Sequence, residues 1–127
     1  MNLTEYNAMP DGDLKLAVRT AVTMGWWPGY FWRFDNGFMV SQIAFKGKKQ
    51  RWWRTVFNPF TDASIPYRLI GQGVDICGKC TEDGEFFAES FSSSDFHVYE
   101  KTLTHAILNA YCQADPMGHW AKFLKGE

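Results

Sequence analysis

Two strand-like runs on either side of a short turn constrain the fold of this chain more than any other feature. The runs read YFWRF and FMVSQIAF, and Asp35-Asn36-Gly37 separates them. Asn and Gly tolerate the positive φ angles that tight hairpin turns require. A third run, RWWRTVF, follows the turn residues GKKQ. This spacing predicts an antiparallel meander over residues 30–34, 38–45 and 51–57.

Helical periodicity appears on both sides of the predicted meander. Apolar residues between Leu14 and Val22 recur at i, i+3, i+4, i+7 and i+8, which predicts a helix over residues 11–24. Asp11 is the expected cap of this helix, and Gly25 is expected to end it. A second apolar stripe predicts a last helix over residues 101–113. The segment after it, HWAKFLKGE, is expected to be a short docked tail.

The region between the meander and the last helix reads as a short helix followed by a second hairpin. Pro66 is compatible with a helix only in the first turn, so that helix is expected to start late. The runs VDICGKC and EFFAESF flank the turn sequence TEDG. The predicted fold is therefore α+β, one domain over residues 1–127. Its mostly antiparallel sheet, a three-stranded meander plus a second hairpin, packs against about three helices.

Length and composition exclude several classes of protein. The 127 residues are 46% hydrophobic and 21% charged, which favours a globular domain over a disordered chain. No apolar run approaches the roughly 18 residues that a membrane span needs, and the first residues lack a signal-peptide pattern. Three cysteines cannot form a closed disulfide framework. We expect a cytoplasmic protein with reduced thiols, without a cofactor and without a membrane partner.

Charge is distributed unevenly along the chain. The net charge is −1, which gives no bulk electrostatic argument for nucleic-acid binding. The segment from Trp26 to Phe60, however, contains six basic residues and one acidic residue. It therefore carries +5, and the rest of the chain carries −6. The same segment holds 12 of the 22 aromatic residues and five of the six tryptophans. Positive charge and aromatic surface therefore coincide.

The segment FKGKKQRWWRT, residues 45–55, concentrates both properties. Exposed tryptophans beside arginines can stack on bases, bind a nucleotide, or form the hot spot of a protein interface. The alternative is that the tryptophans fill the core and GKKQ is an ordinary charged turn. Strand alternation sends Trp52 and Trp53 to opposite faces, so we expect one of them in the core. The candidate binding residues are Lys46, Lys48, Lys49, Arg51, Trp52, Trp53 and Arg54.

No strong catalytic or metal-binding motif accompanies this segment. Cys77 and Cys80 form a CxxC pair, but no further ligands occur at zinc-site spacing. The cluster from Ser92 to Asp95, with His97, holds the residue types of a hydrolase triad without a nucleophile elbow, and is typical of a polar loop. Glu82, Asp83, Glu85 and Glu89 do not follow a calcium-loop pattern. His105 is expected to face solvent. We predict neither a catalytic residue nor a metal ligand.

Three segments, MPDGDLKLAVRTAV, FNPFTDASIPYRLIGQGVDI and LTHAILNAYC, together resemble the small NinX-like proteins of tailed bacteriophages and prophages. The resemblance covers about half of the chain and is weak over residues 26–53. It implies a phage accessory protein in the cytoplasm of a bacterial host, from a family without an established activity. It assigns no functional residues.

These observations give three functional hypotheses. The first is a non-enzymatic binding module that occupies a host protein or assembles into a homodimer through its aromatic and basic surface. The second is nucleic-acid or nucleotide binding through residues 46–54. The third is a small hydrolase. Salt dependence separates the first two, because phosphate contacts weaken steeply as salt rises.

Overall fold

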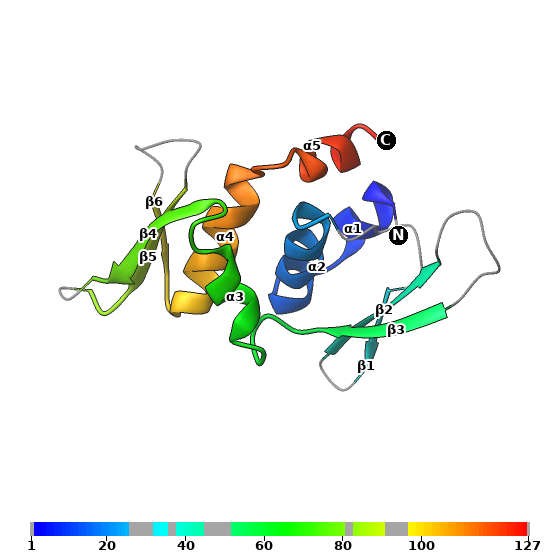
Figure 1. Ribbon diagram of the computed structural model, residues 1–127, viewed down its shortest axis with the longest axis horizontal. Helices are drawn as coiled ribbons and strands as arrows, with labels where there is room; N and C mark the ends of the chain where they lie inside the picture. The colour runs from blue at the N-terminus through cyan, green and yellow to red at the C-terminus, as the bar shows by residue number, and fades with distance from the viewer. Residues whose placement is uncertain are drawn as a thin grey trace.

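Within the residues that the computed structural model describes, the chain forms five helices and six strands (Figure 1). Those residues are 2–25, 32–35, 38–44, 52–80, 83–90 and 97–126, and for 32–35, 38–44, 52–56, 76 and 97 the description covers the backbone alone. The helices are α1 (Leu3–Ala8), α2 (Asp13–Thr23), α3 (Ser64–Leu69), α4 (Leu103–Ala114) and α5 (His119–Leu124). The strands are β1 (Trp32–Asp35), β2 (Phe38–Ala44), β3 (Trp52–Phe57), β4 (Val74–Lys79), β5 (Phe86–Ser90) and β6 (His97–Glu100).

The first sheet is the predicted antiparallel meander, in the order β1-β2-β3. Asp35 pairs with Phe38 across the first turn, so the hairpin closes at the Asn-Gly signal. β3 then pairs with β2 from Met39↔Phe57 to Ala44↔Trp52. The predicted strand positions are confirmed to within two residues at each end.

The second sheet has the order β4-β5-β6 and contains the predicted hairpin and one further strand. β6 is only four residues long, so alternation over it gives little signal in the sequence. The register between β4 and β5 shifts between Val74 and Ile76, which marks a bulge. α4 packs across all three strands of this sheet.

The three predicted helices are confirmed as α2, α3 and α4, and the short helices α1 and α5 are additional. Asp11 does not cap α2, because Gly12 occupies the cap position and Asp11 bonds the side chain of Lys15 instead. Gly25 follows the last turn with φ +91°, a conformation that favours glycine and ends the helix as expected. Pro66 lies in the first turn of α3.

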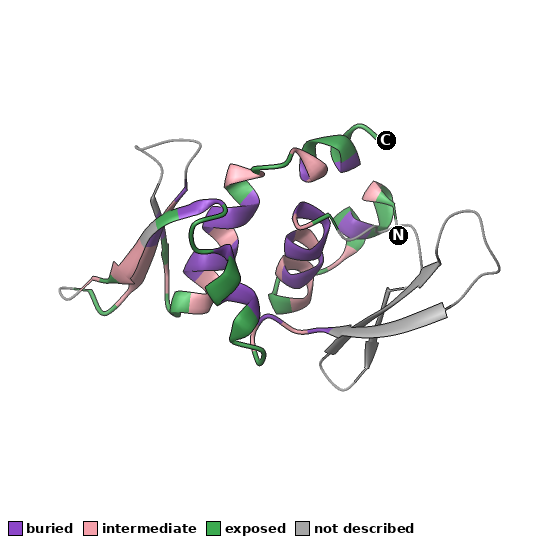
Figure 2. Ribbon diagram, in the orientation of Figure 1, coloured by how far each residue is buried: buried purple, intermediate pink, exposed green. Residues whose placement is uncertain are grey.

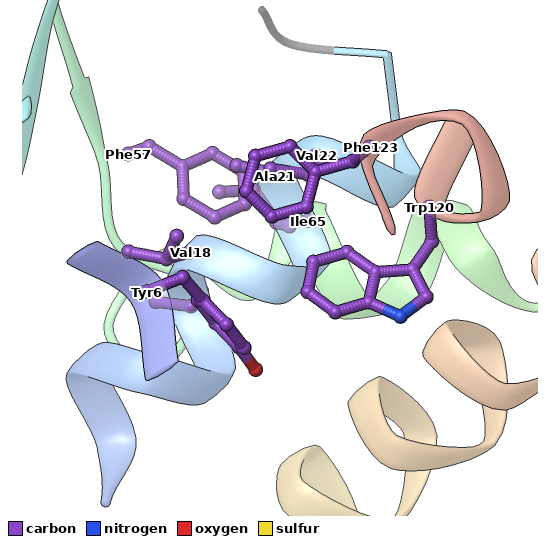
Figure 3. Packing of buried hydrophobic residues seen from close by; sticks show 9 residues of the cluster. Tyr6, Val18, Ala21, Val22, Phe57, Ile65, Trp120 and Phe123 are labelled. Atoms are coloured by element: carbon purple, nitrogen blue, oxygen red, sulfur yellow. The ribbon is translucent and has the colours of Figure 1, made fainter. Parts of the chain in front are cut away.

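A first hydrophobic cluster joins both ends of the chain to the base of the meander (Figure 3). Tyr6 meets Trp120 edge-to-face with ring centroids 5.0 Å apart, which ties α1 to α5. The guanidinium of Arg19 lies over the Trp120 ring. The buried members are Tyr6, Ala17, Val18, Ala21, Val22, Phe57, Ile65, Trp120 and Phe123.

A second cluster fills the space between α4 and the second sheet. Its buried members are Leu69, Val74, Ala88, Val98, Ala106, Ile107, Leu108, Ala110 and Tyr111. Met24 and Phe60 contact both clusters, so the two cores adjoin between α2 and α4. Among the described residues, Figure 2 shows buried positions mainly on the helices α2 and α4. The α+β fold with antiparallel sheets and packed helices is confirmed.

Candidate functional site

The predicted binding segment lies at the start of β3 and in the connection before it. Lys46, Lys48, Lys49 and Arg51 lie outside the described residues. The other three candidates are on β3, where Trp52 pairs with Ala44, Trp53 with Ile43 and Arg54 with Gln42; their side chains are also outside the description. The strand that carries them is confirmed, whereas the exposure of the two tryptophans stays a prediction.

The strands β1, β2 and β3 form an arm that extends away from the helices (Figure 1). Its base is fixed by Phe57, which ends β3 and is 1% exposed in the first cluster. The chain then turns: Asn58 Oδ1 accepts the backbone N–H of Phe60 at 3.0 Å, and Pro59 is buried. α2 approaches the arm through β2. The arm is therefore anchored at the end of β3, and β1, β2 and β3 extend from there away from the helices (Figure 1).

The second sheet presents an outer face, the face turned away from α4. Ala88 and Val98 are buried beneath α4, so alternation places Phe87, Glu89 and Tyr99 on this outer face. Phe87 pairs with Tyr99 on one side and with Gly78 on the other. A Cβ on Gly78 would lie 3.2 Å from the Phe87 ring, so that ring covers the glycine. Tyr99 is 56% exposed, which leaves aromatic surface accessible on this face.

The two cysteines of the CxxC pair are free and half-buried. Cys77 packs against the second cluster, and Cys80 enters a turn in which its N–H donates to the carbonyl of Glu85 and its carbonyl accepts the N–H of Gly84. A redox thiol of the thioredoxin kind lies at a helix start instead. Among the described residues, no group of three or more His, Cys, Asp or Glu side chains has the proximity that metal binding needs.

A polar chain between α2 and α4 brings together residues that the sequence did not connect. His105 Nε2 lies 2.7 Å from Asp13 Oδ1, and His105 Nδ1 is hydrogen-bonded to Thr102 Oγ1. Thr102 caps α4, and its Oγ1 also accepts the His105 backbone N–H at 3.1 Å. The His105 ring lies against Phe60 with centroids 4.9 Å apart. The expectation that His105 faces solvent holds only in part, because its side chain is 28% exposed while its ring contacts Asp13, Thr102 and Phe60.

This hydroxyl, imidazole and carboxylate follow the order of a hydrolase triad, but their surroundings favour a structural role. The Thr102 hydroxyl already caps a helix, and the Asp13 side chain is 65% exposed, so water competes for its charge. Threonine is a favoured N-cap residue, so Thr102 carried a signal for the start of α4 that sequence reasoning did not use. Asp13 is 92 residues from His105 and gave no such signal. Ser92 to Asp95, the earlier triad candidates, lie outside the described residues.

The buried polar groups near α4 are held neutral. Burial raises the pKa of the Cys112 thiol, and the Thr20 hydroxyl lies 3.4 Å from its sulfur. Burial likewise raises the pKa of Tyr111 to about 12. A thiol in such a setting is a packing residue, because the thiolate is the reactive form. These groups stabilise the α2–α4 contact.

Comparisons with protein-family models, with curated proteins and with solved structures found no match to this chain. Among the described residues, none of the helices combines the length and the apolar character that crossing a bilayer requires. The arm and the outer face of the second sheet are the two candidate interaction surfaces. Both are inferred from the geometry and the sequence.

Proposed function

We propose that this protein is a non-enzymatic binding module that grips an acidic surface of a partner protein with its arm. The observation that carries the proposal is the projection of β1, β2 and β3 from the helices, with Phe57 as the buried anchor (Figure 1). A small sheet is stable when an apolar face is covered. Twelve aromatic residues fall between positions 26 and 60, and of these Phe57 and Phe60 are described as packing in or against the first cluster. We propose that a partner covers aromatic surface of this segment.

The basic residues of the arm determine which partner fits. Five of them lie between residues 46 and 54, beside Trp52 and Trp53. Tryptophan and arginine are enriched where protein interfaces concentrate their binding energy. Positive charge around such a centre steers encounters with acidic surfaces and repels basic ones. The module then acts sterically, by occupying the surface it binds.

Nucleic-acid binding by the same residues is the alternative. The formal net charge of −1 argues against it, because the rest of the chain repels phosphate while the arm attracts it. The resemblance to NinX-like phage proteins adds a setting to the proposal: the partner belongs to a bacterial host, and the encounter takes place in its cytoplasm.

Capture of partners from a bacterial lysate tests the proposal, with the full chain immobilised and the lysate split into nuclease-treated and untreated halves. The bait variant Lys48→Glu/Arg51→Glu reverses two charges of the arm. The matched control Lys122→Glu/Lys125→Glu makes the same charge change at exposed positions on and after α5. We expect acidic proteins to be retained after nuclease treatment by the wild type and the control, and lost from the arm variant.

Two results would contradict the proposal. If everything retained disappears with nuclease, nucleic acid is the ligand and the alternative is correct. If the arm variant and the control retain the same proteins as the wild type, the charge of the arm has no part in binding.

A further inference from the structure

We infer that the acidic surface that accepts the arm is present on the chain itself, as the outer face of the second sheet of another copy. The inference rests on the proposed function, because it uses the arm as the binding element. It adds that the partner is a second copy of this chain and that the surface bound is the outer face of its second sheet.

Charge complementarity is the first argument. Residues 71–100, which include the whole second sheet, contain seven acidic residues and one basic residue and carry −6. The segment from 26 to 60 carries +5, with six basic residues and one acidic. The charges of the remaining residues cancel, since these two segments already sum to the total of −1. The protein is therefore electrically polarised along its sequence into one basic and one acidic sheet segment.

The fold places the strands of these two segments on opposite sides of the helices. Figure 1 shows β1, β2 and β3 on one side of the helices and β4, β5 and β6 on the other. α4 covers the inner face of the second sheet, so its outer face points away from the arm of the same copy. The strands of the two segments thus lie apart within one chain, and a second copy can bring β3 to the outer face.

The outer face also has the apolar centre that an interface needs. Tyr99, 56% exposed, lies beside Phe87, whose ring covers Gly78. Glu89 is on the same face, and Asp75 on β4 is exposed. An aromatic centre with acidic neighbours complements the segment 46–54, in which tryptophans and basic residues are neighbours in the sequence. This apolar feature is independent of the charge count and points to the same surface.

The strands of the arm and the outer face lie on opposite sides of the helices, so we expect each copy to give its arm to one neighbour and its outer face to another. Such a contact is heterologous, and copies that use it add head to tail into rings or open chains. Because exposed charge governs the contact, we expect it to be weak and strongly dependent on salt. Growth beyond the dimer at low salt is the signature of this arrangement.

Sedimentation velocity of the full chain at about 10–500 µM, in about 50 and about 500 mM NaCl, measures the association. The face variant is Asp75→Lys/Glu89→Lys, and the arm variant is Lys48→Glu/Arg51→Glu. The control Glu5→Lys/Asp11→Lys changes charge equally at exposed positions near α1. We expect wild type and control to grow beyond dimers at low salt and to dissociate at high salt. Each interface variant should associate at least roughly tenfold more weakly.

Mixing the two interface variants supplies the decisive result. The reversed arm of one then meets the reversed face of the other, so the mixture should associate although neither variant does so alone. Only folded proteins can show this rescue, which excludes misfolding as the cause of the single losses. Failure of the mixture to associate would overturn the inference.

Other outcomes separate this inference from the proposed function. A wild type that stays monomeric at every salt concentration overturns self-association, and the lysate capture then decides the function of the arm independently. A species that stops at the dimer overturns the head-to-tail arrangement. If the face variant dissociates while the arm variant behaves as wild type, the arm is not the element that binds the outer face; the inference fails, and the lysate capture still decides the function of the arm.

Discussion

Replacing Phe57 by alanine tests whether the arm is anchored in the core. Phe57 is 1% exposed and lies where β3 enters the first cluster. A buried phenylalanine removes about 150–250 Å² from water, which at about 25 cal/mol per Å² is worth about 4–6 kcal/mol. Measured Phe→Ala costs in cores, about 3–5 kcal/mol, agree with this figure. Such a loss is a large part of the total stability of a domain, about 5–15 kcal/mol.

Urea unfolding followed by circular dichroism measures the effect. With a slope of about 2 kcal/mol per molar, the midpoint should fall by about 2 M. Tryptophan fluorescence provides a second probe, because five of the six tryptophans lie between Trp26 and Trp53. We expect the fluorescence midpoint to fall at least as far, since the arm loses its anchor. The control Tyr67→Ala removes an aromatic ring that is 78% exposed, and should cost less than about 0.5 kcal/mol. A Phe57 variant as stable as this control would refute the anchoring.

Three further predictions concern the helices. Gly73→Ala should destabilise by about 1–3 kcal/mol in urea unfolding, because the new Cβ would lie 2.8 Å from the Tyr111 ring and 3.3 Å from Pro116; an unchanged midpoint would contradict this packing. Burial raises the pKa of Tyr111 to about 12, so the stabilisation linked to its protonated hydroxyl is intact below pH 10. Between pH 10 and 12 this group should lower the free energy of unfolding by at most about 2.7 kcal/mol. Tyr111→Phe should flatten that part of the stability–pH curve, and an equally steep decline would show that other groups cause it. Thr102→Ala should cost about 1 kcal/mol through loss of the α4 cap, whereas Thr102→Ser keeps the hydroxyl and should cost little; equal losses from both would show that the hydroxyl is not the stabilising group.

Much of the fold could be read from local patterns. The meander followed from the Asn36-Gly37 turn and two further strand runs, and α2 and α4 followed from their apolar stripes. The elements that were missed, α1, α5 and β6, are four to six residues long. Periodicity over so few residues does not separate helix, strand and loop, so packing decides their structure.

The candidate surfaces, too, could be predicted only in part from the sequence. The charge excess at Lys46, Lys48 and Lys49 is visible in the sequence, and so is the acidic character around Glu89. That the strands β1, β2 and β3 lie across the helices from β4, β5 and β6 is known only from the fold (Figure 1). The contact between Asp13 and His105 joins positions 92 residues apart, and no local rule relates them.

Zero-length carbodiimide coupling, which joins a lysine amine to a carboxylate, tests the contact between arm and outer face most directly. Isotope-labelled and unlabelled copies are mixed at low salt, coupled, and mapped by mass spectrometry, so that links between copies are distinguished from links within one. We expect links between copies that join Lys46, Lys48 or Lys49 to Asp75 or Glu89, and we expect these links to be lost at high salt. Links between copies that instead join Lys122 or Lys125 to these carboxylates, with none from the arm, would contradict this contact.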